Sequence, residues 1–521
     1  MVTFTAIVYD FSDKKLGYLK TRFELRAFKN IKVVKINFKK NYNLSDISSD
    51  YVFFIRSGDF LSKNTSNLLL DAIKNNPDLI YTDEAIIGNK ISRLNFYKPD
   101  YSKDMLLSIN YFRNLLVIKN DILQKIKIIK KNDDKTFFYD LILKVISISQ
   151  NIYHIPEVLY FSKVDKKQVS YSDFYQDFDQ IAGEKDLTTY CIENNFFDET
   201  VKSGLFHGTY RVQRQIKGNP LVSIIIPFRD QHELLDKCIN SILSKSSYNN
   251  YEIIGINNGS EEKKTIELMK LLESSSSNIS FYDCDIPFNY SKLNNIGVNK
   301  YSKGEYIVLL NNDTKVISEN WIESLLEHAQ RPDVGVVGAK LLYPDNTIQH
   351  AGIITTLHNN YTGHIFRNLP DEQPGYFFMP NVIRNYNALT FACVMINREN
   401  FNKLDGLDEE LLVAYNDIDF CLRARKLGLL NIYTPYAKLY HYESKSRGVN
   451  DTDEKKNLAK KERDITIAKH PEYFAKDIYF NENLSTLSDE CTEKSPAPIL
   501  VLLYIKILRK LKNICYTSVL E

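Results

Sequence analysis

The hydrophobic pattern from residue 221 onward alternates apolar strands with amphipathic helices. Residues 221–228 (LVSIIIPF) form a continuous β-branched run typical of a strand covered on both faces. Residues 232–246 carry apolar side chains at helical spacing, and strands follow at 251–256 (YEIIGI) and 305–310 (EYIVLL). This alternation predicts an α/β fold with a mostly parallel central sheet. The last two strands end in NNGS and NNDT, which are predicted to line a ligand site because ligands bind at the carboxyl ends of such strands.

The chain of 521 residues is too long for one core, and its pattern divides it into four parts. Residues 1–200 alternate strands and helices, 201–219 form a polar linker, and 220–473 hold the clearest pattern. Residues 474–521 are predicted to be a loose polar tail that ends in a helix. That helix (ILVLLYIKILRKLKNI) is cationic and amphipathic, so it is predicted to lie on a membrane surface or to pack on protein.

The balance of charge and the spacing of cysteines indicate which class of protein this is and in which cellular compartment it works. Lys and Arg number 67 against 65 Asp and Glu, without the basic excess of a dedicated nucleic-acid binder. The seven cysteines are scattered without CxxC pairs, which favours reduced thiols in the cytosol. The N-terminus has no signal-peptide pattern, and no apolar run reaches the roughly 18 residues that span a bilayer. We expect a cytoplasmic protein, with the C-terminal helix as a candidate contact to the inner face of the cytoplasmic membrane.

Three polar elements carry candidate chemistry. Asn311 and Asp313 in NNDT are two residues apart, so both can face one cation, although turn formation alone also explains them. Asp417 and Asp419 precede a helical pattern and are either helix-capping groups or, for Asp417, a general base. His441 follows an apolar strand and is either structural or a ligand, since manganese tolerates imidazole.

These elements occur in a fixed order with other motifs: PLVSIIIPFRDQ, YEIIGINNGS, FNYSKLNNIG, GEYIVLLNNDTKV, VGVVGAKLLYPDNTIQHAG, FNKLDGLDEELLVAYNDIDFCLRARKLG and YHYESKSRG. On these seven motifs, residues 220–471 resemble family 2 glycosyltransferases, the inverting enzymes with the Rossmann-like GT-A fold. The similarity is greatest to bacterial enzymes that build O-antigen, capsule and other surface polysaccharides, including rhamnosyltransferase-like members. The resemblance implies transfer of a sugar from a UDP- or dTDP-sugar to a glycan or lipid-linked glycan acceptor, with Mn²⁺ or Mg²⁺ as cofactor.

The resemblance also implies a role for each matched residue. Asp417 would be the catalytic base, and Asp313 and His441 would bind the metal. The nucleotide sugar would contact Pro227, Phe228, Asp230, Asn257, Asn258, Asn295, Asn311, Asn312, Asp313 and Arg447. Acceptor-side candidates are Asp408, Glu409, Asn416 and Asp419. In two places this sequence departs from the family, because Asn257 and Asn311 stand where aspartate is usual or frequent, which leaves the nucleotide and the metal strength open.

The N-terminal part resembles a worn copy of the same plan. DYVFFIRSGDFLS is similar to EYIVLLNNDTKVIS, and it places Asp59 at the position of Asp313. Two later segments, FFYDLILKV and HIPEVLYFSK, place Phe138 at the position of the base and Phe161 at that of the metal histidine. No second nucleotide-binding strand with an NGS-like turn is apparent. Residues 1–200 are therefore predicted to be a degenerate GT-A-like domain that binds the acceptor or acts as a scaffold.

Three alternatives compete with this interpretation. In a bifunctional polymerase both halves would transfer sugars, and Asp59, Asp83 and Glu84 would then be needed for a second linkage. A sugar-phosphate nucleotidyltransferase commonly has a Gly-rich basic loop after the first strand, which PFRDQHEL does not provide. A noncatalytic glycan-binding protein fits the N-terminal half but leaves the set formed by Asp313, Asp417 and His441 unexplained.

Overall fold

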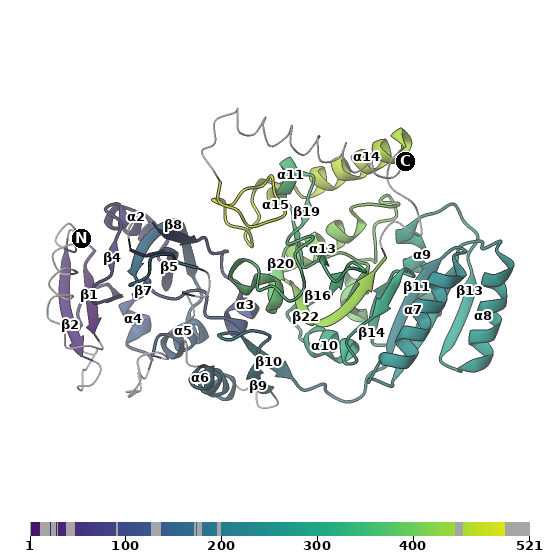
Figure 1. Cartoon of the computed structure of the whole chain (residues 1–521), viewed down its shortest axis with the longest axis horizontal. Helices are drawn as coiled ribbons and strands as arrows, with labels where there is room; N and C mark the ends of the chain where they lie inside the picture. The colour runs from purple at the N-terminus through teal and green to yellow at the C-terminus, as the bar shows by residue number, and fades with distance from the viewer. Residues whose placement is uncertain are drawn as a thin grey trace.

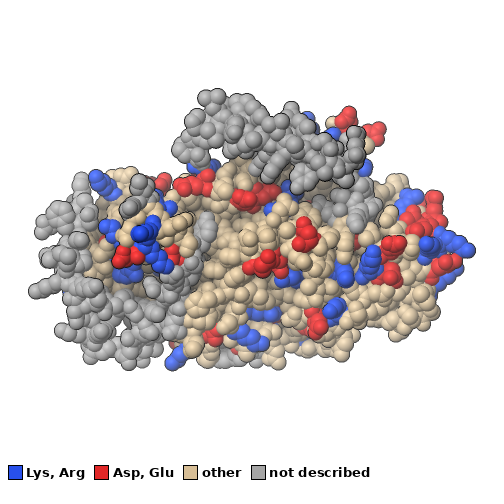
Figure 2. All heavy atoms as spheres, in the orientation of Figure 1, with Lys and Arg blue, Asp and Glu red and all other residues tan. Residues whose placement is uncertain are grey.

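A computed structural model of the chain describes residues 2–10, 21, 25, 28, 30–37, 47–89, 92–126, 137–170, 173, 180–194, 199–442 and 452–494. Figure 1 shows an N-terminal α/β domain on the left and a larger α/β domain on the right. The last described segment, drawn in yellow, lies above the junction between them. On the face in Figure 2, acidic and basic side chains are interspersed, in keeping with a net charge of +2.

The larger domain is built on a mixed sheet. Within the described residues its strands are β11 (Val222–Phe228), β12 (Tyr251–Asn257), β13 (Ile279–Asp283), β14 (Tyr306–Leu310), β15 (Thr314–Val316), β16 (Val334–Leu342), β17 (Ile348–His350), β20 (Arg384–Tyr386), β21 (Cys393–Asn397) and β22 (Leu430–His441). β11 pairs in parallel with β12 and β14, and β12 pairs in parallel with β13. β21 runs antiparallel between β14 and β16. The predicted fold class, an α/β GT-A arrangement, is confirmed.

Helices cover this sheet, which explains the continuous apolar run of its first strand. Ile225 belongs to one apolar core, whereas Ile224 and Ile226 belong to the core on the opposite face. A strand that is buried on both faces has no polar side to alternate with. The helices of the domain are α7 (His232–Lys245), α8 (Lys263–Ser275), α9 (Tyr290–Ile296), α10 (Trp321–Ala329), α11 (Leu357–Asn360), α12 (Arg398–Lys403), α13 (Asn416–Lys426), α14 (Asp453–Lys469) and α15 (Pro471–Ala475).

The N-terminal domain has a second sheet, in the order β2-β1-β3-β7-β5-β8-β4 with β6 beside β5. Its strands are β1 (Phe4–Asp10), β2 (Ile31–Asn37), β3 (Tyr51–Arg56), β4 (Phe60–Leu61), β5 (Leu79–Ile87), β6 (Arg93–Phe96), β7 (Leu116–Lys119) and β8 (Ile152–Lys163). Its helices are α2 (Thr65–Ala72), α3 (Lys103–Ser108), α4 (Asn120–Leu123), α5 (Phe137–Ile148) and α6 (Gln180–Glu193).

The two sheets share one topology. The order β12-β11-β14-β21-β16-β22-β15 repeats as β2-β1-β3-β7-β5-β8-β4, with the same pairing directions and the same order along the chain. One expectation was wrong. The second strand of the N-terminal copy is present as β2, parallel to β1, and it was missed because its sequence, IKVVKIN, lacks the NGS-like turn. Among the described residues, β13 and β20 have no strand counterpart in the first sheet.

The two predicted connecting segments are more ordered than their polarity indicates. Residues 201–219 include most of a hairpin formed by β9 (Glu199–Ser203) and β10 (Tyr210–Arg214). The prediction of a loose tail was wrong for residues 474–494, since Phe474, Tyr479 and Leu484 are buried. The predicted C-terminal helix lies outside the described residues. None of the described helices is long and apolar enough to cross a membrane.

Candidate active site

The turn after β14 places Asp313 against the end of β22. Thr314, at the start of β15, pairs with His441 across the antiparallel ladder, and the hydroxyl of Thr314 donates to the carbonyl of Asn311 at 2.9 Å. Asp313 Oδ1 lies 3.2 Å from His441 Nε2. The two residues are 3% and 7% exposed. The sheet register therefore brings together two side chains that are 128 residues apart in the sequence.

This pair fits one side of a divalent-cation site. Adjacent ligands of an octahedral Mg²⁺ ion lie about 3 Å apart, close to the 3.2 Å between Asp313 Oδ1 and His441 Nε2. The side-chain amide nitrogen of Asn311 lies 3.5 Å from the same histidine nitrogen. Nowhere in the described ranges do three or more His, Cys, Asp or Glu side chains form a group that could hold a metal. Within the described ranges the pair therefore offers two ligands, and water or phosphate oxygens would supply others.

Asp417 lies in the first turn of α13, directly after Tyr415 and Asn416. Burial of this half-buried carboxyl raises its pKa from 3.8 to about 6. The backbone N–H of Ile418, at 2.8 Å, and hydrogen bonds from Phe391 and the Thr390 side chain act in the opposite direction. A carboxylate with this pKa is ionised at neutral pH and is still basic enough to accept a proton efficiently.

Two hydrogen bonds and the backbone between them link Asp417 to the aspartate–histidine pair. The backbone of Phe391 donates to Asp417, and the next carbonyl, that of Ala392, accepts from the backbone N–H of Asn311 at 3.0 Å. Asn311 begins the turn that carries Asp313. The structure thus anchors all three predicted chemical groups to one end of neighbouring strands, as expected for an active site at the carboxyl edge of a parallel sheet.

The predicted nucleotide site contains a carboxylate that the sequence reasoning missed. Asn257, at the end of β12, donates from its side-chain amide to Asp283 Oδ1 at 2.7 Å. Its own oxygen accepts from the backbone N–H of Ser260 at 3.0 Å. Asp283 is the exposed last residue of β13, so it supplies a negative charge next to the position where the family usually has aspartate. The signal in the sequence was the DCD triplet at a strand end.

Several other predicted nucleotide ligands shape the loops at this edge. Asp230 Oδ1 accepts from two successive backbone N–H groups, those of residues 261 and 262, at 2.8 Å each. Asn258 donates to the carbonyls of Cys284 and Ile286. Phe228 follows Pro227 at the end of β11, and its ring packs edge-on against Phe281.

The remaining predicted ligands differ in how they are placed. Asn312 is buried beside Asp313. Asn295 lies away from the aspartate–histidine pair, because its side chain exchanges two hydrogen bonds, both of 2.8 Å, with the backbone of Leu407. Arg447 lies outside the described residues.

The acceptor-side candidates separate into two groups. Both oxygens of Asp419 are bound within the fold, to Arg423 at 2.7 Å and to His470 at 2.8 Å, so this residue anchors helices. Asp408 forms an ion pair with Lys469, and Glu409 accepts from Asn295. Asn416 is different. It is buried directly beside Asp417, and its side-chain nitrogen has no hydrogen-bond partner among the described residues.

The equivalent site of the N-terminal domain is filled by its own side chains. Phe161 pairs with Phe60, at the position where His441 pairs with Thr314 in the larger domain. The rings of Phe161 and Phe60 stack with their centres 5.0 Å apart. Phe138, in the first turn of α5, packs on the rings of Tyr9 and Phe54.

Asp59, the counterpart of Asp313, is buried with its carboxylate bound by three neighbours, one of them the backbone N–H of Lys163 at 3.3 Å. It pairs with Arg56 at 3.2 Å and accepts from the Tyr160 hydroxyl at 2.7 Å. The positions that match Asp417 and His441 hold Phe138 and Phe161 in this half, as the comparison of motifs predicted.

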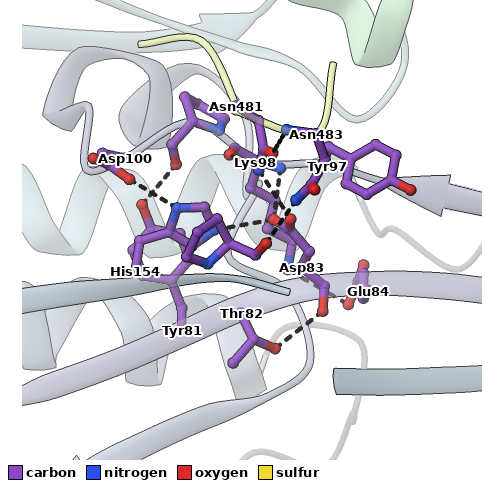
Figure 3. A network of polar contacts seen from close by, with 12 residues as sticks. Tyr81, Thr82, Asp83, Glu84, Tyr97, Lys98, Asp100, His154, Asn481 and Asn483 are labelled. Atoms are coloured by element: carbon purple, nitrogen blue, oxygen red, sulfur yellow. Dashed lines mark hydrogen bonds and ion pairs between the residues drawn. The ribbon is translucent and has the colours of Figure 1, made fainter. Parts of the chain in front are cut away.

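Asp83 has a structural role at the contact between this domain and the C-terminal segment, as Figure 3 shows. Its carboxylate accepts from the backbone N–H of Lys98 at 2.8 Å and from Asn481 at 2.9 Å, and it lies 3.0 Å from His154. The other ring nitrogen of His154 lies 2.9 Å from Asp100. Burial alone would lower the pKa of His154, but the two carboxylates outweigh it and the pKa is raised.

Glu84, next in the chain, points to a different set of partners. It pairs with Arg113, accepts from Asn114 at 2.9 Å, and lies 3.6 Å from the buried amine of Lys98. Burial lowers the pKa of Lys98 to about 8. These contacts use both acids of YTDE in a buried network, so neither one lies at an open site in this structure.

Known proteins are similar to this chain in sequence and in fold. Residues 223–401 match the family described as glycosyl transferase family 2. An uncharacterized protein, y4gI of Sinorhizobium fredii, is 36% identical over 452 residues, which cover 86% of this chain and 50% of the relative. The O-antigen biosynthesis protein RfbC of Myxococcus xanthus is 32% identical over 411 residues, which cover 78% of this chain and 32% of that protein. The chain therefore spans about half of the first relative and about a third of the second.

A solved structure of similar fold is the mannosyltransferase PcManGT from Pyrobaculum calidifontis, in complex with GDP-Man and Mn²⁺. It aligns with a TM-score of 0.37 and 12% identity, over 49% of this chain and 66% of that one. Residues 223–401 therefore hold a glycosyl transferase family 2 domain, and most of the chain is similar to an O-antigen biosynthesis protein.

Proposed function

We propose that this chain is an inverting glycosyltransferase that moves one sugar from a UDP- or dTDP-sugar to a lipid-linked or growing surface polysaccharide. The observation that supports it most directly is the contact between Asp313 and His441, which the backbone at Asn311, Ala392 and Phe391 links to Asp417. Such a set meets the two chemical needs of the reaction, a proton acceptor for the nucleophile and neutralisation of the departing diphosphate.

Asp417 acts as the general base in this proposal. Its ionised carboxylate accepts the proton of the acceptor hydroxyl, whose oxygen attacks the anomeric carbon from the face opposite the nucleotide. Helix α13 holds the carboxylate through the backbone N–H of Ile418, and the Thr390 side chain fixes it from the other side. The bond from the sugar to the diphosphate breaks as the new glycosidic bond forms, with inversion at that carbon.

Asp313 and His441 would hold a Mn²⁺ or Mg²⁺ ion, which supplies positive charge to the leaving diphosphate when bound. The short distance between the two side chains supports this assignment. Asn257 and Asp283, at the ends of β12 and β13, would contact the nucleoside, and the backbone around Asn311 would approach the phosphates. The six described cysteines are all free thiols, which supports a cytoplasmic site of action.

For the N-terminal domain we propose a noncatalytic, supporting role. Phe138 and Phe161 occupy the positions of the base and the metal histidine, and Asp59 is already paired with Arg56. A polymerase with two active halves would need a different proton acceptor in this domain. The shared buried network of Figure 3 favours a domain that braces the C-terminal segment instead.

A thermal-shift screen of UDP- and dTDP-sugars, with and without Mn²⁺, tests the proposal. We expect at least one donor to raise the melting temperature only when Mn²⁺ is present, and Asp313→Ala to remove that rise. Asp345→Ala, which alters an exposed turn aspartate of the same domain, is the matched control and should keep it. If no nucleotide sugar stabilises the wild-type protein, the proposed function is wrong.

A further inference from the structure

Helix α14 fixes the segment that leads into the base. Glu462 is 1% exposed, and its carboxylate accepts from three successive backbone N–H groups. These are Leu412 at 2.7 Å, Val413 at 3.2 Å and Ala414 at 2.7 Å. Helix α13 begins two residues after Ala414, at Asn416. The bonds from Glu462 therefore fix the start of the helix that carries Asp417.

The next residue of α14 supports an exposed aromatic ring. The guanidinium of Arg463 lies 4.1 Å from the ring centre of Tyr361. Arg463 is itself held by Asp464 at 2.8 Å. Although one face of the ring lies against this cation, Tyr361 remains 59% exposed. The cation holds this solvent-exposed ring in one orientation before any ligand arrives. Binding to the ring therefore costs less conformational entropy.

Tyr361 also contacts the segment that carries Asp417. The Tyr415 hydroxyl donates to the backbone carbonyl of Tyr361 at 2.8 Å, and Tyr415 precedes Asp417 by two residues. Burial raises the pKa of the Tyr415 phenol, and the charge of Asp417 adds to this rise, as expected for neighbouring groups. The exposed ring therefore lies on the Asp417 side of the site, whereas the turns predicted to hold the nucleotide follow β11 and β12.

We propose that Tyr361 is a stacking platform for a pyranose ring of the acceptor. This inference rests on the proposed function, because it assigns the acceptor side of the same site. The apolar C–H face of a pyranose packs on an aromatic face, while its hydroxyl groups stay at the rim, where they remain hydrated or bind polar side chains. Tyr361 and Arg463 together would hold the sugar on the Asp417 side of the site.

The test uses saturation-transfer difference NMR with methyl glycosides of glucose, galactose, rhamnose and N-acetylglucosamine at millimolar concentration. We expect at least one of them to give a signal with the wild-type protein. Tyr361→Ala should weaken that binding about three- to tenfold, the usual range for loss of one ring contact. Tyr361→Phe is the matched control. It keeps the ring and the bond from Tyr415 to the backbone carbonyl, and it loses only the hydroxyl contact to Arg463, so it should keep most of the binding.

Two results would overturn the platform: equal signals from the alanine variant and the wild type, or no signal from any pyranoside with the wild type. Mn²⁺-dependent stabilisation by nucleotide sugars is measured on the same proteins. If the alanine variant lost that stabilisation instead, the ring would be binding the donor nucleotide, and the acceptor assignment would be wrong. If donor stabilisation is absent from the wild type, the proposed function itself fails, whatever the pyranosides show.

Discussion

Replacing Asp417 with asparagine should stabilise the protein at neutral pH while it abolishes transfer. Burial raises the pKa of this carboxyl to about 6, above its ordinary value of 3.8. In the unfolded chain the carboxyl ionises near pH 3.8. Above that pH, ionisation favours the unfolded chain and lowers the free energy of unfolding. This loss of stability is complete above pH 6, where the folded protein is ionised as well. The difference between the two values corresponds to about 3 kcal/mol.

Asparagine avoids that cost but accepts fewer hydrogen bonds. The carboxylate is bound by the Ile418 and Phe391 backbones and by Thr390, and one amide oxygen cannot serve all three. Losing part of this set costs about 1 kcal/mol. The net expectation for Asp417→Asn is a gain of about 2 kcal/mol above pH 6 that fades as the pH falls toward 4, where both proteins are uncharged at this site.

Urea unfolding followed by tryptophan fluorescence measures this gain. The chain has one tryptophan, Trp321, which is fully buried in α10 of the same domain. Asp419→Asn is the control, two residues along the same helix. His470 and Arg423 outweigh burial and lower the pKa of Asp419, so its loss should destabilise the protein at neutral pH. Two results would refute this reasoning. In one, the Asp417→Asn variant is no more stable than the wild type at about pH 8. In the other, its gain in stability persists at about pH 4.

Four further predictions concern the metal pair, the positioning glutamate and, in two measurements, the domain contact. Asp313→Ala should lose Mn²⁺-dependent donor binding in calorimetry, and unchanged affinity would place the metal elsewhere. Glu462→Gln should lower kcat about tenfold with little change in donor KM, because the single amide oxygen of glutamine must then accept from three N–H groups. A change in donor KM alone would contradict this prediction. Asn481→Ala should lower stability by about 1–3 kcal/mol by leaving Asp83 short of a donor. Because the pKa of His154 is raised in the fold, protonated His154 stabilises this contact fully below pH 6.5. That contribution is lost as the pH rises through the raised pKa. A profile of melting temperature against pH measures the loss.

The sequence predicted most of what local pattern and sheet geometry determine. The apolar run of β11 and the turn after β14 lie where strand periodicity placed them, because a doubly buried strand has one recognisable composition. The alignment of Phe161 with His441 is also confirmed, since both residues pair with the strand after the matching turn. Strand register carries this information over long distances once the order of strands is known.

Other features depend on contacts that no local pattern shows. The polar segment 474–494 reads as loose, yet Asn481 fills a hydrogen-bonding position beside Asp83, almost 400 residues earlier. Asp419 has the same local appearance as Asp417, but His470 and Arg423 neutralise it. A carboxylate's role is set by which partners surround it, and those partners come from remote parts of the chain.

The central claim is that Asp417 is the base of a metal-assisted sugar transfer, and donor turnover measured against pH tests it most directly. Release of nucleoside diphosphate from the donor identified in the thermal-shift screen is followed in the presence of Mn²⁺. The wild-type rate should rise with pH through about 6, as the carboxyl ionises. Asp417→Asn should bind the donor with unchanged affinity and release almost no diphosphate at any pH. Near-normal release by this variant would contradict the account.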